Sequence, residues 1–110
     1  MNFNMKWTAS EKIVARAAFD TALESALAGI MAEFKKRASA ATTPSEMWDI
    51  EDYLRQQRKE IDENFDYRYS QLSFVFASLI RQGHLDKSLL AGLSEEKREI
   101  IRSILGSAAR

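Results

Sequence analysis

The chain lacks cysteine and has a single histidine, His84, among its 110 residues. Without cysteine there can be no disulfide, no thiolate nucleophile and no cysteine-ligated zinc site. One histidine cannot form a histidine metal cluster, and no nucleophile has the paired base that covalent catalysis requires. We therefore expect no catalytic residue, no metal site and no cofactor. His84 follows Gly83, so we interpret it as part of a helix cap rather than as a catalyst.

Helix breakers, excess charge and long apolar runs are also scarce. One Pro and four Gly leave long stretches free for helices, and no strand pattern is present. The 16 basic and 16 acidic residues balance, whereas nucleic-acid binders usually carry a basic excess. No stretch approaches the roughly 20 apolar residues that span a bilayer, and the first residues, MNFNMKW, lack the apolar run of a secretory signal. We expect a cytoplasmic protein with no nucleic-acid partner and no integral membrane segment.

Two helix-start signals organise the rest of the sequence. Hydrophobic residues make up 45% of the chain, which suits one all-α domain spanning residues 1–110. Thr8 and Glu11 have the spacing of a capping box, in which each side chain satisfies the other's free backbone N–H. Thr43 is a favourable N-cap and Pro44 suits the first helical position. The first helix has apolar residues at mostly helical spacing, namely Ile13, Ala17, Leu23, Leu27, Ile30 and Phe34.

The second helix is predicted to be unusually long, because no Gly or Pro follows Pro44 until Gly83. Its apolar stripe has spacings of three and four and consists of Met47, Ile50, Leu54, Gln57, Ile61, Phe65, Leu72, Phe76 and Leu79. We expect one unbroken helix over 44–81, antiparallel to the first. Residues 8–82 would then form a stem of two long helices, and short helices in residues 83–110 a small head. The alternative is a break near Asn64 that folds the chain back into a compact monomer.

The length of that helix predicts a dimer. At 1.5 Å per residue it would be roughly 57 Å long, whereas a compact globule of this size is roughly 35 Å across. One antiparallel neighbour cannot cover its apolar surface, and the segment LSFVFASLI is apolar on nearly all sides. We therefore predict a homodimer with two-fold symmetry. The predicted dimer interface consists of Met47, Ile50, Leu54 and Ile61.

One side chain of the second helix is out of place. Trp48 projects roughly 125° away from the apolar stripe and is surrounded by charged residues, namely Glu51, Asp52, Arg55 and Lys59. Arg58 lies on the flank of the stripe. Because Trp and Arg are favoured at protein interfaces, we predict a partner-binding surface there. The alternative is that Trp48 packs in the protein's own dimer interface.

Further candidates lie nearer the C-terminus. Tyr67 and Phe74 project almost opposite the main stripe, so we expect them in the core beneath the C-terminal helices. An exposed Phe74 would instead be an anchor for a second partner contact. The head also carries Lys97, Arg98 and Arg102, which we interpret as a solvated charged face, with a basic patch as the alternative.

The stretch MWDIEDYLRQQRKEIDENFDYRYSQLSFVFASLIRQGHL resembles the central helix of the fluorescence recovery proteins of cyanobacteria. Its most specific part is the order of Trp48, Asp52, Arg58, Glu60, Ile61 and Asp62, followed by FVFA. Trp7 and LLAGLSEEKREIIRSIL extend the resemblance over nearly the whole chain. The resemblance implies a helical dimer that binds the photoactivated orange carotenoid protein, mainly through its C-terminal domain. Binding would speed return to the resting orange form and end quenching of the phycobilisome.

The resemblance also assigns residues. The partner-binding residues would be Trp48, Asp52 and Arg58 on the stem and Phe74 on the head. No bound cofactor is implied, and in a cyanobacterium the protein would lie in the cytoplasm, peripheral to the thylakoids. Two positions depart from the family: Glu51 replaces a His, and Ile100 replaces a basic residue. They motivate an alternative, a helical homodimeric interaction or scaffold protein of the same fold with a different partner.

Overall fold

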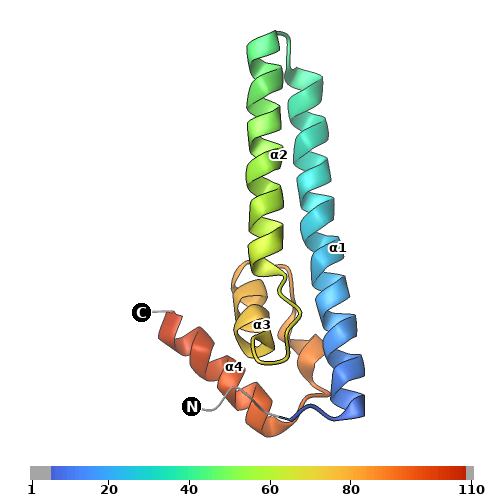
Figure 1. The fold of residues 1–110 in the computed structure, drawn as a ribbon, viewed down its shortest axis with the longest axis vertical. Helices are drawn as coiled ribbons and strands as arrows, with labels where there is room; N and C mark the ends of the chain where they lie inside the picture. The colour runs from blue at the N-terminus through green and yellow to red at the C-terminus, as the bar shows by residue number, and fades with distance from the viewer. Residues whose placement is uncertain (1–5, 109–110) are drawn as a thin grey trace.

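The computed structural model describes residues 6–108, which contain helices and no strand. Its elements are α1 (Ala9–Ala40), α2 (Pro44–Asn64), α3 (Leu72–Arg81), the 3-10 helix η1 (Lys87–Leu90) and α4 (Glu95–Ala108). Helices α1 and α2 lie side by side as an antiparallel stem, and α3, η1 and α4 gather at one end as a head (Figure 1). The predicted all-α stem and head are confirmed. The N-terminal residues MNFNM, part of the segment in which no secretory signal was found, lie outside the described residues.

The prediction of one unbroken helix over 44–81 is wrong. Helix α2 ends at Asn64, residues 65–71 form a non-helical connector, and α3 packs against α4. The third helix therefore belongs to the head and not, as expected, to a stem reaching residue 82. The break does not produce a compact globule either. The radius of gyration is 16.8 Å, compared with about 13–14 Å for a compact domain of this length.

Aromatic packing explains why the helix stops. Phe65 and Tyr67 both place their rings edge-on against Phe19 of α1, with centroids 5.4 and 4.9 Å apart. The ring of Tyr69 lies 5.6 Å from that of Trp7. Residues two apart lie roughly 200° apart around a helix but on the same side of an extended chain. Only a non-helical connector can direct all three rings to α1 and to Trp7 just before it, where each aromatic pair contributes about 0.5–1.5 kcal/mol.

Two cations on α1 complete this contact. The guanidinium of Arg16 lies 4.0 Å from the ring centroid of Tyr67, and the ammonium of Lys12 lies 5.2 Å from that of Tyr69. Cation–π contacts of this kind contribute about 0.5–1 kcal/mol each at exposed sites. Tyr67 is half-buried against the core, as expected, but it packs on α1 and not beneath the C-terminal helices.

Helix α1 does not bury the face on which its larger apolar residues lie. Ile13 is 72% exposed and Leu27 is 47% exposed. The apolar residues that α1 buries are mostly small, namely Ala15, Ala18, Phe19, Ala22 and Ala26. Small side chains let neighbouring elements approach closely, and the fully buried residues Leu72, Phe76 and Leu79 of α3 supply most of the bulk. The core therefore lies in the head and the adjoining end of the stem.

The local cap signals are confirmed. The Thr8 hydroxyl accepts from the Glu11 amide and the Glu11 carboxylate accepts from the Thr8 amide, both at 3.1 Å. Gly83 has φ 82°, and the amide of His84 donates to the carbonyl of Leu79 at 3.0 Å. This is the left-handed helix end that the pair Gly83–His84 predicts.

A buried ion pair fastens the head to the stem. Glu11 Oε1 accepts from Lys97 Nζ at 3.1 Å, and Glu11 Oε2 accepts from the amide of Ser94 at 2.9 Å. Lys97 Nζ also donates to the carbonyl of Lys6 at 2.8 Å. Burial raises the pKa of Glu11, but hydrogen bonds from Thr8, Ser94 and Lys97 outweigh it and lower the pKa to about 2. Lys97 is 4% exposed, so its predicted place on a solvated face is wrong.

No helix within residues 6–108 combines the length and apolar character needed to cross a membrane.

Candidate functional site

The outer face of α2 is the surface on which the candidate residues lie. The helix begins at Pro44, where the Thr43 hydroxyl accepts from the amide of Glu46 at 3.2 Å. Not one residue of α2 is buried. One flank of α2 faces α1, and the opposite face is exposed to solvent. Trp48 is 59% exposed there, which is unusual for a side chain that proteins normally keep covered.

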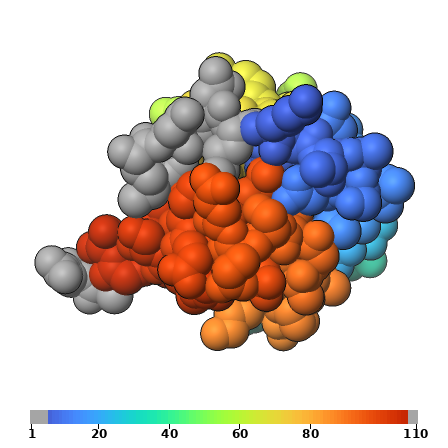
Figure 2. Space-filling view, turned by 90° about the horizontal axis from the view of Figure 1, so that it is seen from below, coloured from blue at the N-terminus to red at the C-terminus, as the bar shows by residue number. Residues whose placement is uncertain are grey.

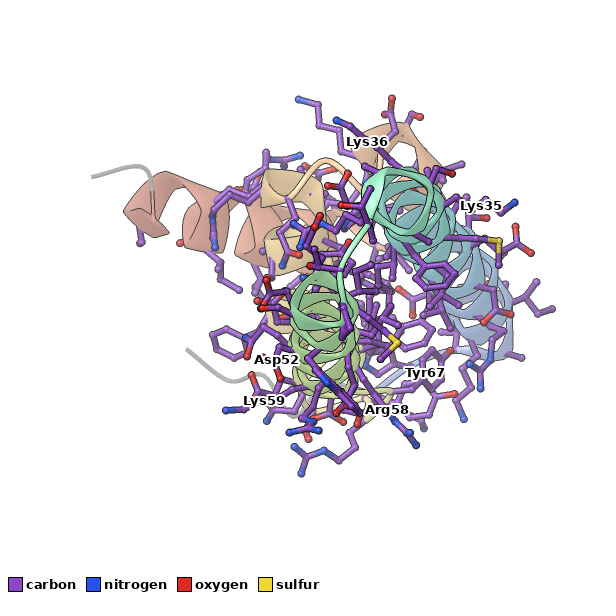
Figure 3. All side chains as sticks on the ribbon, turned by 90° about the horizontal axis from the view of Figure 1, so that it is seen from above. Lys35, Lys36, Asp52, Arg58, Lys59 and Tyr67 are labelled. Atoms are coloured by element: carbon purple, nitrogen blue, oxygen red, sulfur yellow. The ribbon has the colours of Figure 1, made fainter. Side chains whose placement is uncertain are left out.

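Charged residues surround this indole. Positions three and four apart on a helix are neighbours, so Glu51 and Asp52 adjoin Trp48, and Arg55 adjoins Glu51 on the same face. The Glu51 carboxylate accepts a hydrogen bond from the Arg55 guanidinium. Asp52 and Lys59 extend from α2 on the side away from α1 (Figure 3). The face thus combines a large apolar group with both signs of charge, as protein interfaces commonly do.

Arg58 lies on a different flank of α2. In the view down the stem, Arg58 lies on the same flank as Tyr67, whereas Lys35 and Lys36 project from α1 on the far side of the stem (Figure 3). Arg58 is exposed. The structure therefore places Trp48, Glu51, Asp52 and Arg55 on one face and Arg58 at its edge.

Phe74 lies in the head and not with these residues. Phe74 is 42% exposed on α3. The expected core position is therefore wrong, and the exposed alternative holds. It lines a shallow depression with Glu63 and Asn64, at the end of α2. Along the helix, residue 63 is roughly 22 Å from residue 48. Within one protomer Trp48 and Phe74 can therefore contact only different parts of a partner.

The stem also has apolar side chains that neither of its helices covers. Of the residues predicted in the dimer interface, Met47 is 52% exposed, and Ile50, Leu54 and Ile61 are half-buried. Helix α1 contributes a second stripe, with Leu27, Met31 and Phe34 exposed by 47%, 58% and 38%. Each helix thus carries apolar residues that remain in contact with water in a single copy.

Two features of the head bear on the sequence predictions: the ion pairs of its arginines and the burial of Ile100. Arg98 and Arg102 pair with Glu95 at 2.7 and 2.6 Å, so these charges neutralise one another locally. Ile100, where the resemblance implies a basic residue, is 8% exposed and is therefore buried in the head. Among residues 6–108, no group of three or more His, Cys, Asp or Glu side chains could hold a metal ion.

These features define a class: an all-helical stem-and-head protein with an exposed tryptophan surface on the stem. Residues 7–105 match the family described as the photoprotection regulator fluorescence recovery protein. The chain belongs to this family, whose members are regulators, and the resemblance seen in the sequence is thereby confirmed.

Individual relatives agree with this assignment. The chain is 33% identical over 98 residues to the fluorescence recovery protein of Synechocystis sp., covering 89% of this chain and 90% of that protein. The solved structures of the fluorescence recovery proteins of Fremyella diplosiphon and Synechocystis sp. are 36% and 32% identical to it. Both match with a TM-score of 0.86 and cover 90% of this chain and 97% of theirs.

Proposed function

We propose that this protein binds the photoactivated orange carotenoid protein, mainly through its C-terminal domain, and speeds its return to the resting orange state. Quenching of the phycobilisome would then end. Membership of a family of photoprotection regulators supports the proposal. The observation that carries it is Trp48, 59% exposed on a charged helix face beside Asp52, with Arg58 at the edge.

The mechanism needs binding energy and no catalytic group. A protein that prefers the compact state of its partner, or the route to it, shifts the population by its differential affinity. A tenfold preference corresponds to about 1.4 kcal/mol, and one buried hot-spot Trp contributes about 2 kcal/mol or more. In this proposal the preference comes from the partner surface defined by Trp48, Glu51, Asp52, Arg55 and Arg58, with Phe74 as a second anchor. The protein thus acts as a cytoplasmic binding partner, peripheral to the thylakoids in a cyanobacterium, and not as an enzyme.

The functional unit in this proposal is a homodimer. Helix α2 buries no residue in a single copy, and Leu27, Met31 and Met47 are each about half exposed. A second stem packed against these side chains, with Ile50, Leu54 and Ile61, would remove them from water at about 25 cal/mol per Å². Light scattering should give about twice the protomer mass of 12.6 kDa at micromolar concentration. Leu54→Glu should lower the mass to that of the protomer.

The function is tested with the purified partner. The orange carotenoid protein is converted to its red form by light, this protein is added at one dimer per partner, and recovery of the orange absorbance is followed in the dark. Wild-type protein should accelerate recovery. Arg58→Leu should slow it while leaving the dimer mass unchanged. Lys36→Leu, which removes an exposed cation from the far side of the stem (Figure 3), should behave like wild type.

Absence of any acceleration by the wild type would eliminate this partner. An Arg58→Leu variant as active as Lys36→Leu would show that the surface is wrongly placed.

A second candidate function keeps the dimer and changes the partner. Its motivation is Glu51, which stands on the exposed face and pairs with Arg55 where the family has His. The buried Ile100 no longer supports it, because that side chain is inaccessible. If wild type fails in the recovery assay and Glu51→His succeeds, the surface has diverged toward another protein. If both fail, the partner lies outside the carotenoid proteins.

A further inference from the structure

Two methionines lie on the stem, and both are in contact with water in a single copy of the chain. Met31 of α1 is 58% exposed and Met47 of α2 is 52% exposed. Because the chain has no cysteine, methionine thioethers are its only sulfur groups. Oxidation converts a methionine thioether into a polar sulfoxide, which reductases can convert back. Both side chains are therefore candidate modification sites that the proposed partner surface does not use.

Both methionines belong to apolar stripes of the stem. Met31 is four residues after Leu27 and three before Phe34, and Met47 is seven residues before Leu54, so each shares a helix face with these residues. The two sulfur atoms, drawn in yellow, project from the same flank of the stem (Figure 3).

The head does not cover this apolar flank. Seen from below, the last turns of α4 extend sideways beyond the rest of the molecule (Figure 2). In the view down the stem, α4 lies on the opposite side from both sulfur atoms (Figure 3). The flank is therefore open to an oxidant in a single copy, and it is equally open to a second copy of the stem.

A sulfoxide changes what this flank can bury. Hydrogen peroxide oxidises the thioether by two electrons: the O–O bond breaks, one oxygen forms a bond with the sulfur, and the other leaves as water. The apolar sulfur thereby becomes a polar group that accepts hydrogen bonds. The apolar neighbours Leu27, Phe34 and Leu54 have no side-chain donor to offer it. Burial of a polar group without a hydrogen-bond partner is destabilising.

We propose that Met31 and Met47 are oxidation sites through which hydrogen peroxide opposes dimerisation of the stem. This inference rests on the proposed homodimer, in which a second copy of the chain covers the apolar flank. The oxidant reacts with the single copy, where both sulfur atoms are accessible, and the dimer protects them. An oxidised dimer would have to bury two sulfoxides from each copy. Oxidation therefore shifts the population from dimer to protomer, and methionine sulfoxide reductases reverse the shift.

Light scattering before and after treatment with hydrogen peroxide tests this inference. Peptide mass spectrometry establishes that Met31 and Met47 have each gained one oxygen. The mass should fall from about twice the protomer mass of 12.6 kDa to the protomer mass at the same micromolar concentration. The dissociation constant of the dimer should rise at least about tenfold. Incubation with both methionine sulfoxide reductases should restore the dimer, which distinguishes dissociation from irreversible unfolding.

Three variants separate the effect of these two sulfur atoms from other effects of the oxidant. Met31→Leu combined with Met47→Leu keeps apolar side chains and should stay dimeric after the same treatment, although Met1 and Met5 remain. Met31→Gln combined with Met47→Gln introduces polar groups without an oxidant and should have the protomer mass when untreated. Leu89→Gln makes a similar change at a residue of the head that is 44% exposed and should stay dimeric.

The inference is overturned if wild type keeps the dimer mass with both methionines fully oxidised, or if the double Leu variant dissociates as wild type does. A double Gln variant that remains dimeric overturns it as well. Wild-type protein that has the protomer mass before any treatment refutes the dimer of the proposed function, and with it this inference.

Discussion

Replacing Glu11 by Gln removes the charge that holds α4 against the start of α1. The pKa of this carboxyl falls from 4.5 to about 2, because the hydrogen bonds from Thr8, Ser94 and Lys97 outweigh the opposing effect of burial. Each pKa unit corresponds to about 1.4 kcal/mol, so ionised Glu11 contributes about 3 kcal/mol to the free energy of unfolding at neutral pH. This value agrees with the cost of removing one partner of a buried ion pair in other proteins, which is about 3–5 kcal/mol.

The direction of the pH dependence follows from the depressed pKa. The contribution of Glu11 is fully present above pH 4.5, is lost as the pH falls toward 2, and is absent below both values. Urea unfolding, followed by circular dichroism at one fixed protein concentration, measures it. The difference between wild type and Glu11→Gln should be about 3 kcal/mol at neutral pH and should shrink to near zero around pH 2.

Two controls make this result specific. Glu24→Gln removes an exposed carboxylate from the same helix and should change the free energy of unfolding by no more than about 0.5 kcal/mol. Lys97→Met, combined with Glu11→Gln, should cost less than the sum of the two single variants, because no unpaired buried charge remains. A loss below about 1 kcal/mol, or one that is the same at pH 7 and pH 2, would refute the assigned role of Glu11.

Three further substitutions test other parts of the fold. Gly29→Ala should raise the free energy of unfolding by about 1 kcal/mol, because Ala favours a helix and an added Cβ meets nothing within 4 Å; a loss would indicate that another molecule packs there. Gly83→Ala should lower it by about 1 kcal/mol in the same urea assay, because its φ of 82° is unfavourable for Ala. Arg16→Met should lower it by about 1 kcal/mol through the lost contact with Tyr67. Asp20→Asn, which removes only the ion pair of Arg16, should have a smaller effect.

The helix starts were predictable because their determinants are local. The capping signals at Thr8 and Thr43 each involve residues three positions apart. The box of Thr8 and Glu11 forms in full, and at Thr43 the hydroxyl caps the Glu46 amide while the Glu46 carboxylate accepts from the amide of Thr42 instead of that of Thr43. The end of α2 was not predictable by periodicity. Apolar spacings of three and four continue through residue 65, while the competing contact, with Phe19, lies 46 positions earlier in the chain. The alternation of aromatic residues in FDYRY was the available signal, because a period of two conflicts with a helix.

The same distinction governs the candidate site. The exposure of Trp48 follows from the phase of one helix, so the projection of α2 alone places it correctly among charged residues. The phase is lost at the break, which is why Phe74 was expected in the core and lies 42% exposed. The pairing of Lys97 with Glu11 joins residues 86 positions apart and has no local signature. The sequence positions of charged residues therefore predicted a solvated face where the fold forms a buried ion pair.

Stem and head depend on different sources of stability. The head shares a core with the first half of α1, in which α3 fully buries Leu72, Phe76 and Leu79. Helix α2 buries nothing and contacts α1 along one flank, partly through the guanidinium of Arg37 over the ring of Tyr53 at 4.1 Å. A helix of 21 residues with so little packing is only marginally stable in water. Any molecule that covers the apolar side chains of the stem therefore also stabilises α2. It thereby stabilises the surface on which Trp48 lies. If the stem dimerises as proposed, this is a physical reason for partner binding to depend on dimerisation.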